Sequence, residues 1–137
     1  MVSLVIGSLL YLLARPANLL VFGWIGSLGL SGPLMRLRET LAPLARALPA
    51  WVLFSLPNAL WAYAFTVAMS HMWSHKLSRA SLPWLAVGPV ISIGAELGQG
   101  IGLVPGTFDL VDLLTVVIAC VAALRRVRLD GLGRGGA

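Results

Sequence analysis

Long apolar runs separated by short polar segments dominate the second half of the chain. The runs are Trp51–Trp73, Leu82–Gly98 and Thr107–Leu124. A helix that crosses a bilayer needs ~20 predominantly apolar residues, within a range of about 17–25. Tryptophans at both ends of the first run are typical of side chains that anchor a helix at the membrane–water interface. The three runs therefore predict three membrane-spanning helices.

The pattern is less regular before residue 50. The apolar run from Val2 to Ala14 is short for a span, and Arg15 and Pro16 interrupt it. We predict one short or tilted span that begins at Val2, followed by an interfacial or re-entrant segment over residues 17–35. Two full spans in this region, giving five in total, are the alternative. The more polar residues 36–49 favour an amphipathic surface helix. The predicted fold is thus an all-α, small polytopic membrane protein with four transmembrane helices.

Composition agrees with a membrane protein. The chain of 137 residues is 58% hydrophobic and only 11% charged, whereas soluble domains carry about 25% charged residues. So few polar side chains cannot cover a water-soluble globule of this size. The length predicts a single transmembrane domain over residues 1–128, and the glycine-rich residues 129–137 predict a disordered tail. The lone Cys120 lies in an apolar run and is expected to be a buried packing thiol.

The basic residues predict an orientation rather than a nucleic-acid partner. The net charge is +5, and lysine and arginine flank the apolar runs. With four spans, one side of the membrane holds Lys76, Arg79, Arg125, Arg126, Arg128 and Arg134. The other side holds Arg15, Arg36, Arg38 and Arg46. Because positive charge accumulates on the cytoplasmic side, both termini are predicted to be cytoplasmic in a multi-pass protein of the cell membrane.

Three of the five acidic residues lie around one short turn that contains no lysine or arginine. Glu96 and Gln99 end the second apolar run, and Asp109 and Asp112 begin the third. Within each pair the spacing is i,i+3, so both members share one helix face. The linking residues 99–106 are glycine-rich and predict a tight hairpin. We expect a small acidic pocket on the outer side.

These carboxylates need partners, because isolated charges at membrane depth are costly. Asp109 has a local explanation: it lies in the first turn of a helix, where the helix dipole favours an anion and Thr107 is the predicted N-cap. Glu96 and Asp112 lack such an explanation. We predict that Arg36 or Arg15, which lie on the same outer side, supplies their counter-ion.

Other polar residues add weaker candidates. Asn58 follows Pro57 in the apolar run and would line the same pocket if the proline opens the helix there. An ordinary proline kink is the alternative. His71 and His75 have i,i+4 metal-ligand spacing. They lie far from the acidic residues, and no third ligand is evident, so interfacial histidines are the favoured interpretation.

The stretch "GAELGQGIGLVPGTFDLVDLL", residues 94–114, resembles the signature of the VanZ-like membrane family, whose namesake is associated with teicoplanin resistance. The matching residues are Glu96, Gln99, Pro105, Gly106, Phe108, Asp109 and Asp112. "YLLARP" and "SLPNALWAYAF" are also similar to this family, so the likeness extends over residues 7–124. Gly106 departs from the pattern, because family members often have an arginine there; Val116 and Ala119 stand where asparagine and glycine are common. The missing arginine removes the local counter-ion.

The resemblance implies a protein of the bacterial inner membrane with an outward-facing polar pocket. Such a protein would bind or modulate a cell-envelope component (a cell-wall precursor, a lipid headgroup or a glycopeptide) and affect glycopeptide susceptibility. Beside the lipid bilayer, no nucleic-acid partner and no resident cofactor are expected. One alternative is a small membrane-embedded enzyme in which Glu96, Asp109 and Asp112 hold a divalent cation near a phosphate-bearing or lipid-linked substrate. No nucleophile–base pair is evident, so a non-enzymatic role is favoured. A structural subunit of a membrane complex is the other alternative.

Overall fold

The structure is a computed structural model that describes residues 2–74 and 78–134. Over these residues the chain forms seven α-helices and no β-strand. The helices are α1 (Val2–Ala14), α2 (Leu20–Ser27), α3 (Ser31–Ala47), α4 (Ala50–Phe54), α5 (Leu56–Met72), α6 (Leu82–Gly100) and α7 (Leu110–Arg134). The predicted all-α fold is confirmed.

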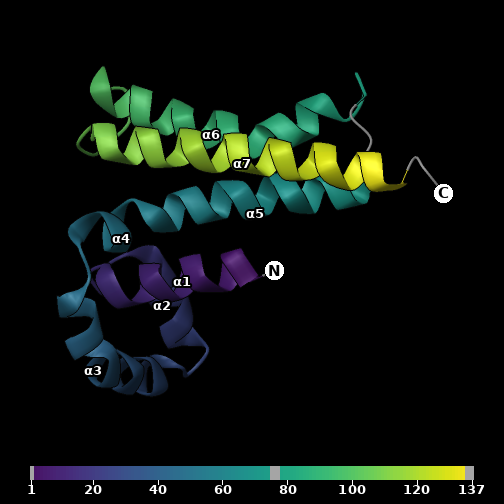
Figure 1. The fold of residues 1–137 in the computed structure, drawn as a ribbon. Coiled ribbons are helices and arrows are strands. Elements are labelled where there is room, and N and C mark those ends of the chain that lie inside the picture. Colours follow the sequence, from purple (N-terminus) through teal and green to yellow (C-terminus); the bar gives the residue numbers. More distant parts are fainter. Residues whose placement is uncertain (1, 75–77, 135–137) are drawn as a thin grey trace.

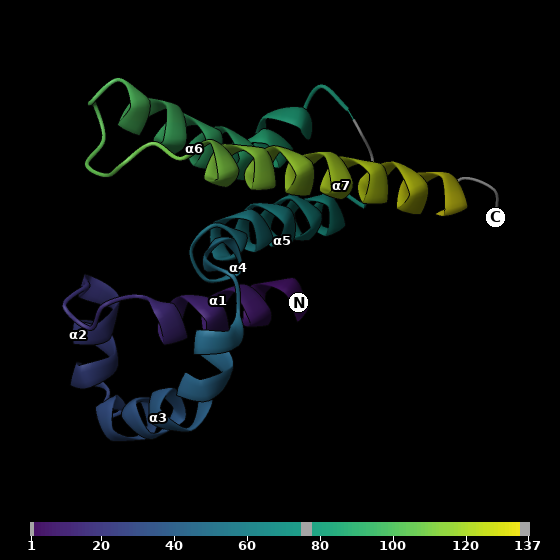
Figure 2. The ribbon, with the colours of Figure 1, turned by 60° about the vertical axis from the view of Figure 1, so that its left-hand side comes forward.

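Four of the helices run roughly alongside one another (Figure 1). α5 packs against α1, α6 and α7, and α6 and α7 also contact each other. The end of α1, the short α4 and the α6–α7 connection lie together at one end, which we name the turn end (Figures 1 and 2). The last turns of α5 and α7 lie at the opposite end, named the terminal end, and the shorter α1 begins partway along the bundle. Successive long helices therefore alternate in direction, so α5 and α7 are parallel.

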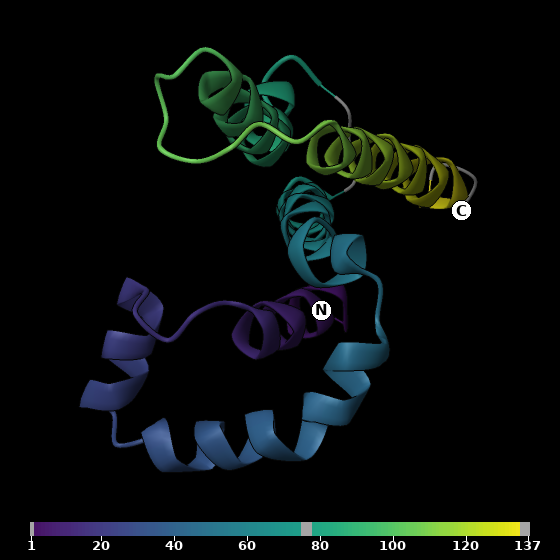
Figure 3. The same cartoon turned by 90° about the vertical axis from the view of Figure 1, so that its left-hand side faces the viewer.

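α2 and α3 form an arm that leaves this bundle on the side of α1 away from α5 (Figure 3). The arm touches the bundle mainly where α3 contacts α1. No residue of α3 is buried, and Phe22 is the buried residue of α2. The predicted segment over residues 17–35 and the predicted surface helix thus correspond to α2 and α3.

α4 and α5 follow one helical path with a break at Ser55. The Ser55 N–H donates to the Trp51 carbonyl (3.0 Å), and the Ser55 carbonyl accepts from the Ala59 N–H (3.4 Å). Pro57 at the start of α5 has no N–H to continue the helical ladder, which explains the interruption. The apolar run Trp51–Trp73 is therefore divided at the proline kink that its sequence suggested.

The seam between α5 and α7 is built from small and polar side chains. Buried positions on α5 are Pro57, Ala59, Ala62, Thr66 and Ser70. Facing them on α7 are Val116, Cys120, Ala123 and Val127. From Ala59 onward on α5, and throughout on α7, these positions repeat every three or four residues, the spacing that keeps one helix face against its neighbour. The burial predicted for Cys120 is confirmed. Thr66 satisfies its hydroxyl by donating to the Ala62 carbonyl (2.9 Å).

α1 approaches α5 closely because Gly7 is buried opposite Trp61. A Cβ at Gly7 would lie 3.1 Å from the Trp61 ring. The Trp61 Nε1–H donates to the Ser8 hydroxyl (3.3 Å), and the Trp61 and Tyr11 rings lie 5.0 Å apart. These contacts place the end of α1, and with it Arg15, at the turn end beside α4.

Several boundaries differ from those expected. α6 continues to Gly100, and α7 begins at Leu110 rather than Thr107. α7 also continues to Arg134, through part of the segment expected to be a tail from residue 129; residues 135–137 lie outside the described residues. The sequence predicted four transmembrane helices, with five as the alternative. Within residues 2–74 and 78–134, no helix is both long enough and apolar enough to cross a membrane.

Candidate functional site

Glu96 is the most buried acidic residue and the centre of the candidate site. It lies in the second-last turn of α6 with only 5% of its surface exposed. Its Oε2 atom is buried and has no hydrogen-bond partner. A buried polar atom without a partner costs free energy, so it needs a local reason. The structure therefore places an unused acceptor inside the turn end.

Asp112 and Asp109 lie close enough to Glu96 to interact with it electrostatically, Asp112 more strongly. Asp112 is half-buried in the first turn of α7, and Asp109 is exposed just before it. The Asp109 Oδ1 atom accepts a hydrogen bond from the Val111 N–H (2.8 Å). Asp109 is thus the N-cap of α7, and the prediction of Thr107 in that role is wrong, because the helix begins three residues later than expected.

Gln99 shapes the turn between α6 and α7. Its side chain lies against Gly106, where an added Cβ would be 2.8 Å from the Gln99 Cδ atom. Gly106 also has φ of 140°, which only glycine adopts without strain. The Val104 side chain packs in a similar way against Gly98, where an added Cβ would lie 2.7 Å from it. Gln99 therefore supports the turn that presents Asp109.

Asn58, on α5, contacts the face of α6 that also carries Glu96. Its Oδ1 atom accepts a hydrogen bond from the Ser92 hydroxyl of α6 (3.4 Å). Ser92 and Glu96 are four residues apart and share a helix face. Both Asn58 and Ser92 line a groove of about 550 Å³ between α1, α5 and α6. Sequence reasoning missed Ser92, although its i,i+4 spacing from Glu96 was a signal that could have found it.

Arg15 lies just after the end of α1 and is the predicted counter-ion that the fold brings nearest to Glu96. It interacts electrostatically with Glu96, and its Nη2 donates to the Phe54 carbonyl at 3.4 Å. Its guanidinium carbon lies 5.7 Å from the centres of both the Tyr11 and Phe54 rings. In the described part of the chain, however, no ion pair joins Arg15 to Glu96, Asp109 or Asp112.

Arg36, the other predicted counter-ion, is not brought to the acidic residues. It is exposed on α3, where its backbone carbonyl accepts from the Thr40 hydroxyl (2.9 Å). No ion pair of Arg36 occurs within residues 2–74 and 78–134. Among the described residues, the structure thus offers no contact that supports the predicted pairing of Arg36 with the acidic turn.

Arg38, two residues further along α3, faces α1 in its place. Its Nη2 donates to the Arg15 carbonyl (3.0 Å), and its guanidinium carbon lies 5.3 Å from the Phe22 ring centre. Residues two positions apart point in different directions on a helix. The structure therefore brings Arg38 to the end of α1.

The described residues contain no group of three or more His, Cys, Asp or Glu side chains that could hold a metal ion. Glu96, Asp109 and Asp112 are thus not arranged as a common ligand set for a divalent cation. His71 is exposed near the end of α5, and His75 lies outside the described residues. The chemistry of the turn end is therefore that of charged and amide groups.

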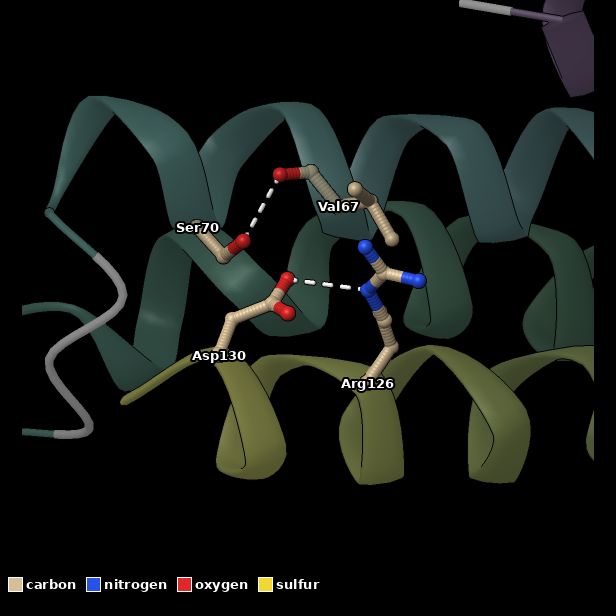
Figure 4. Close-up of polar contacts among 4 residues, drawn as sticks. All are labelled: Val67, Ser70, Arg126 and Asp130. Carbon is tan, nitrogen blue, oxygen red and sulfur yellow. Dashed lines mark hydrogen bonds and ion pairs between the residues drawn. The ribbon is translucent and has the colours of Figure 1, made fainter. Parts of the chain in front are cut away.

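The charged groups at the terminal end are arranged differently (Figure 4). The Arg126 Nε donates to the Asp130 Oδ2 (3.0 Å), an i,i+4 ion pair on α7. Beside them on α5, the Ser70 hydroxyl donates to the Val67 carbonyl (2.7 Å). These contacts join residues that are close in sequence.

Comparison with protein families, with curated proteins and with solved structures finds no match to this chain.

Proposed function

We propose that this chain is a VanZ-like protein embedded in the cell membrane, which binds the polar headgroup of a cell-envelope component at its turn end. The observation that carries the proposal is the buried Glu96 carboxylate, whose Oε2 has no partner in the bundle. A ligand with a hydrogen-bond donor or a positive charge would satisfy this oxygen. Asp112 beside it adds negative charge, and Arg15 offers a donor to a negative group of the same ligand.

The distribution of apolar side chains supports a membrane environment. Large apolar residues are exposed along every long helix, among them Val5, Val90, Ile91 and Ile118. The buried residues are instead mostly small or polar, such as Ala62 and Thr66. Small residues between helices with large apolar ones outside are typical of helix packing in lipid. In water such a surface would favour aggregation.

The path through α4 and α5 has a length suited to a bilayer. α4 has 5 residues, α5 has 17, and Ser55 continues the backbone hydrogen bonds between them. At a rise of 1.5 Å per residue this path is about 34 Å long, against about 30 Å for the hydrocarbon core. Trp51 and Trp73 stand at its two ends, as interfacial anchors do.

Charge supports an orientation with the turn end outside. In the sequence, residues 15–46 and 96–112 together hold four arginines and four acidic residues. Residues 76–79 and 125–134 hold six basic residues and one acidic residue. These later segments therefore carry the whole net charge of +5, and positive charge favours the cytoplasmic side. The last described turns of α7 lie at the terminal end (Figure 1).

The arm of α2 and α3 suits the outer membrane–water interface. In α2, Trp24 is 67% exposed, and Leu20 and Leu28 are exposed as well. α3 carries Arg36 and Arg46 on an otherwise partly apolar helix without a buried residue. A helix with apolar and basic faces lies in the interface plane, with its apolar face among the lipids.

The residues that carry the VanZ-like resemblance support the proposed position of the site. The motif residues from Glu96 to Asp112 form the turn end, and Gln99 occupies the space that a side chain at Gly106 would need. VanZ-like proteins often have an arginine at position 106. In this chain the position is Gly106, and the Gln99 side chain packs against it. Among the described residues, Arg15 is the cation whose charge acts on Glu96.

The proposal is tested in two stages. Washing the membranes with alkaline carbonate should leave the full chain in the membrane pellet. A reporter enzyme that works only in the cytoplasm should be active when fused to the C-terminus, and one that works only outside the cytoplasm should be inactive there. Cells that express the wild type should then differ in glycopeptide susceptibility from cells that express Glu96→Gln, while Asp130→Asn should behave as the wild type. Release of the chain by carbonate would overturn the membrane assignment. Equal susceptibility with and without the protein would overturn the envelope function.

A further inference from the structure

Two arginines, Arg15 and Arg38, are neighbours at the end of α1, and neither forms an ion pair in the described part of the chain. Arg38 from α3 donates to the carbonyl of Arg15, which fixes the two residues side by side. Glu39, next to Arg38 in sequence, is exposed and forms no ion pair in the described part of the chain. The structure thus brings a second arginine, from α3, to the main chain of Arg15 at the turn end.

Both guanidinium groups are held in place and incompletely bonded. Arg15 lies between the Tyr11 and Phe54 rings, and Arg38 lies over the Phe22 ring. The Arg15 Nε and the Arg38 Nη1 are buried and have no hydrogen-bond partner. Burying an N–H donor without an acceptor is costly, and the cost is larger when the donor is charged. An acceptor that carries negative charge would remove this cost from both groups at once.

We propose that Arg15 and Arg38 form a binding site for the phosphate group of a ligand. A guanidinium pair matches phosphate because several parallel N–H groups can donate to several oxygens of one anion. Stacking on aromatic rings leaves the edges of the guanidinium groups available as donors.

This inference rests on the proposed function and names the anionic half of its ligand. Glu96 and Asp112 would contact a donor or cationic group, and Arg15 and Arg38 would bind a phosphate beside it. Phosphate-bearing headgroups occur where the turn end would lie, at the outer membrane surface. The same chemistry would also accept free phosphate, so the test includes both sources.

The experiment uses the full chain, purified in an uncharged detergent. The probes are a short-chain phosphatidylglycerol, diacylglycerol with the same chains, and inorganic phosphate against chloride at equal ionic strength. The melting temperature is followed as each probe is titrated. We expect it to rise with phosphatidylglycerol and not with diacylglycerol. A rise with inorganic phosphate as well would assign the site to phosphate in general, and a rise with the lipid alone would assign it to a headgroup.

Variants locate the site. Arg38→Gln should weaken phosphatidylglycerol binding about 10- to 100-fold, the effect of losing hydrogen bonds to a charged group. Arg36→Gln is the matched control, because it removes the same charge two residues away and should retain wild-type affinity. Arg38→Lys keeps the charge but lacks the forked donors, and should bind more weakly than the wild type. Affinity, rather than absolute melting temperature, is compared, so an unstable variant remains informative.

Two results would overturn the inference: equal shifts with phosphatidylglycerol and diacylglycerol, or equal losses in Arg36→Gln and Arg38→Gln. If Arg38→Gln binds as the wild type does while Glu96→Gln still changes glycopeptide susceptibility, the phosphate site is excluded and the proposed function stands. If neither variant changes anything, both are excluded.

Discussion

The charged side chains at the two ends of the bundle differ in their bonding partners. At the terminal end, Arg126 and Asp130 pair across one turn of α7. At the turn end, Glu96 comes from α6, Arg15 from the end of α1 and Arg38 from α3, and each keeps a buried polar atom without a partner. Groups that are satisfied by neighbours in sequence need no ligand. Groups that are gathered from distant elements and left unsatisfied indicate a site.

Serines show the same contrast. At the beginning of α6, the Ser78 N–H donates to the Ser81 hydroxyl (2.9 Å), and the Ser81 N–H donates to the Ser78 hydroxyl (3.1 Å). These bonds close a turn locally. At the turn-end half of the bundle, the Ser92 hydroxyl instead crosses from α6 to Asn58 on α5. The Ser92–Asn58 contact therefore joins two helices, whereas the Ser78–Ser81 contacts stay within one turn.

The largest effect is expected from Glu96→Gln. The amide keeps the shape of the side chain but removes its charge, so ligand binding should weaken about tenfold or more while the protein still folds. Thermal unfolding in detergent and a headgroup titration measure the two effects separately. Asp130→Asn is the control and should leave binding unchanged. If both substitutions reduced binding equally, the contrast between the two ends would be lost.

The next largest effect is expected from Gly106→Ala, which should lower the free energy of unfolding. The added Cβ would lie 2.8 Å from Gln99 and would also strain a backbone with φ of 140°. A loss of about 2–4 kcal/mol in the free energy of unfolding is expected from overpacking and strain together. Denaturant unfolding in micelles measures it.

Gly94→Ala is the matched control for that prediction. Gly94 lies within α6, and a Cβ there meets nothing within 4 Å. Because alanine favours helix, this change should stabilise the protein by about 0.5–1 kcal/mol. A destabilised Gly94→Ala would mean that α6 tolerates no change near the site, and Gly106 would then not be special.

Asp109→Ala should have a moderate effect, since it removes the N-cap of α7. The lost hydrogen bond to the Val111 N–H should cost about 1 kcal/mol. Thr107→Ala should cost little, because Thr107 lies before the helix and does not cap it. Comparing the two melting temperatures checks the assignment, and the opposite order would restore Thr107 as the cap.

The smallest effect is expected from Arg126→Ala at the terminal end. This arginine is 62% exposed, and exposed ion pairs contribute little to stability. Any change in melting temperature should disappear at high salt, because salt screens exposed charges. A large, salt-independent loss would show that the Arg126–Asp130 pair supports the bundle, and the two ends would then be less different than proposed.

Much of the helical organisation could be predicted from local patterns. The helix Val2–Ala14 was expected at the bounds it has, and α6 starts at the expected Leu82. Apolar runs, prolines and glycines act within a few residues, so sequence is sufficient for them. The start of α7 was misplaced by three residues, because Thr107 and Asp109 are both good caps and the choice depends on how the turn packs on Gly98 and Gly100.

The sequence by itself determined that the chain is helical, that its acidic residues cluster at one turn, and that no cation lies within that turn. Only the tertiary structure decided which groups face one another. It buried Glu96, left Asp109 exposed as a cap, and chose Arg38 over Arg36 as the neighbour of Arg15. The physical reason is rotational: local sequence sets which residues share a helix face, but packing against a distant helix sets where that face points.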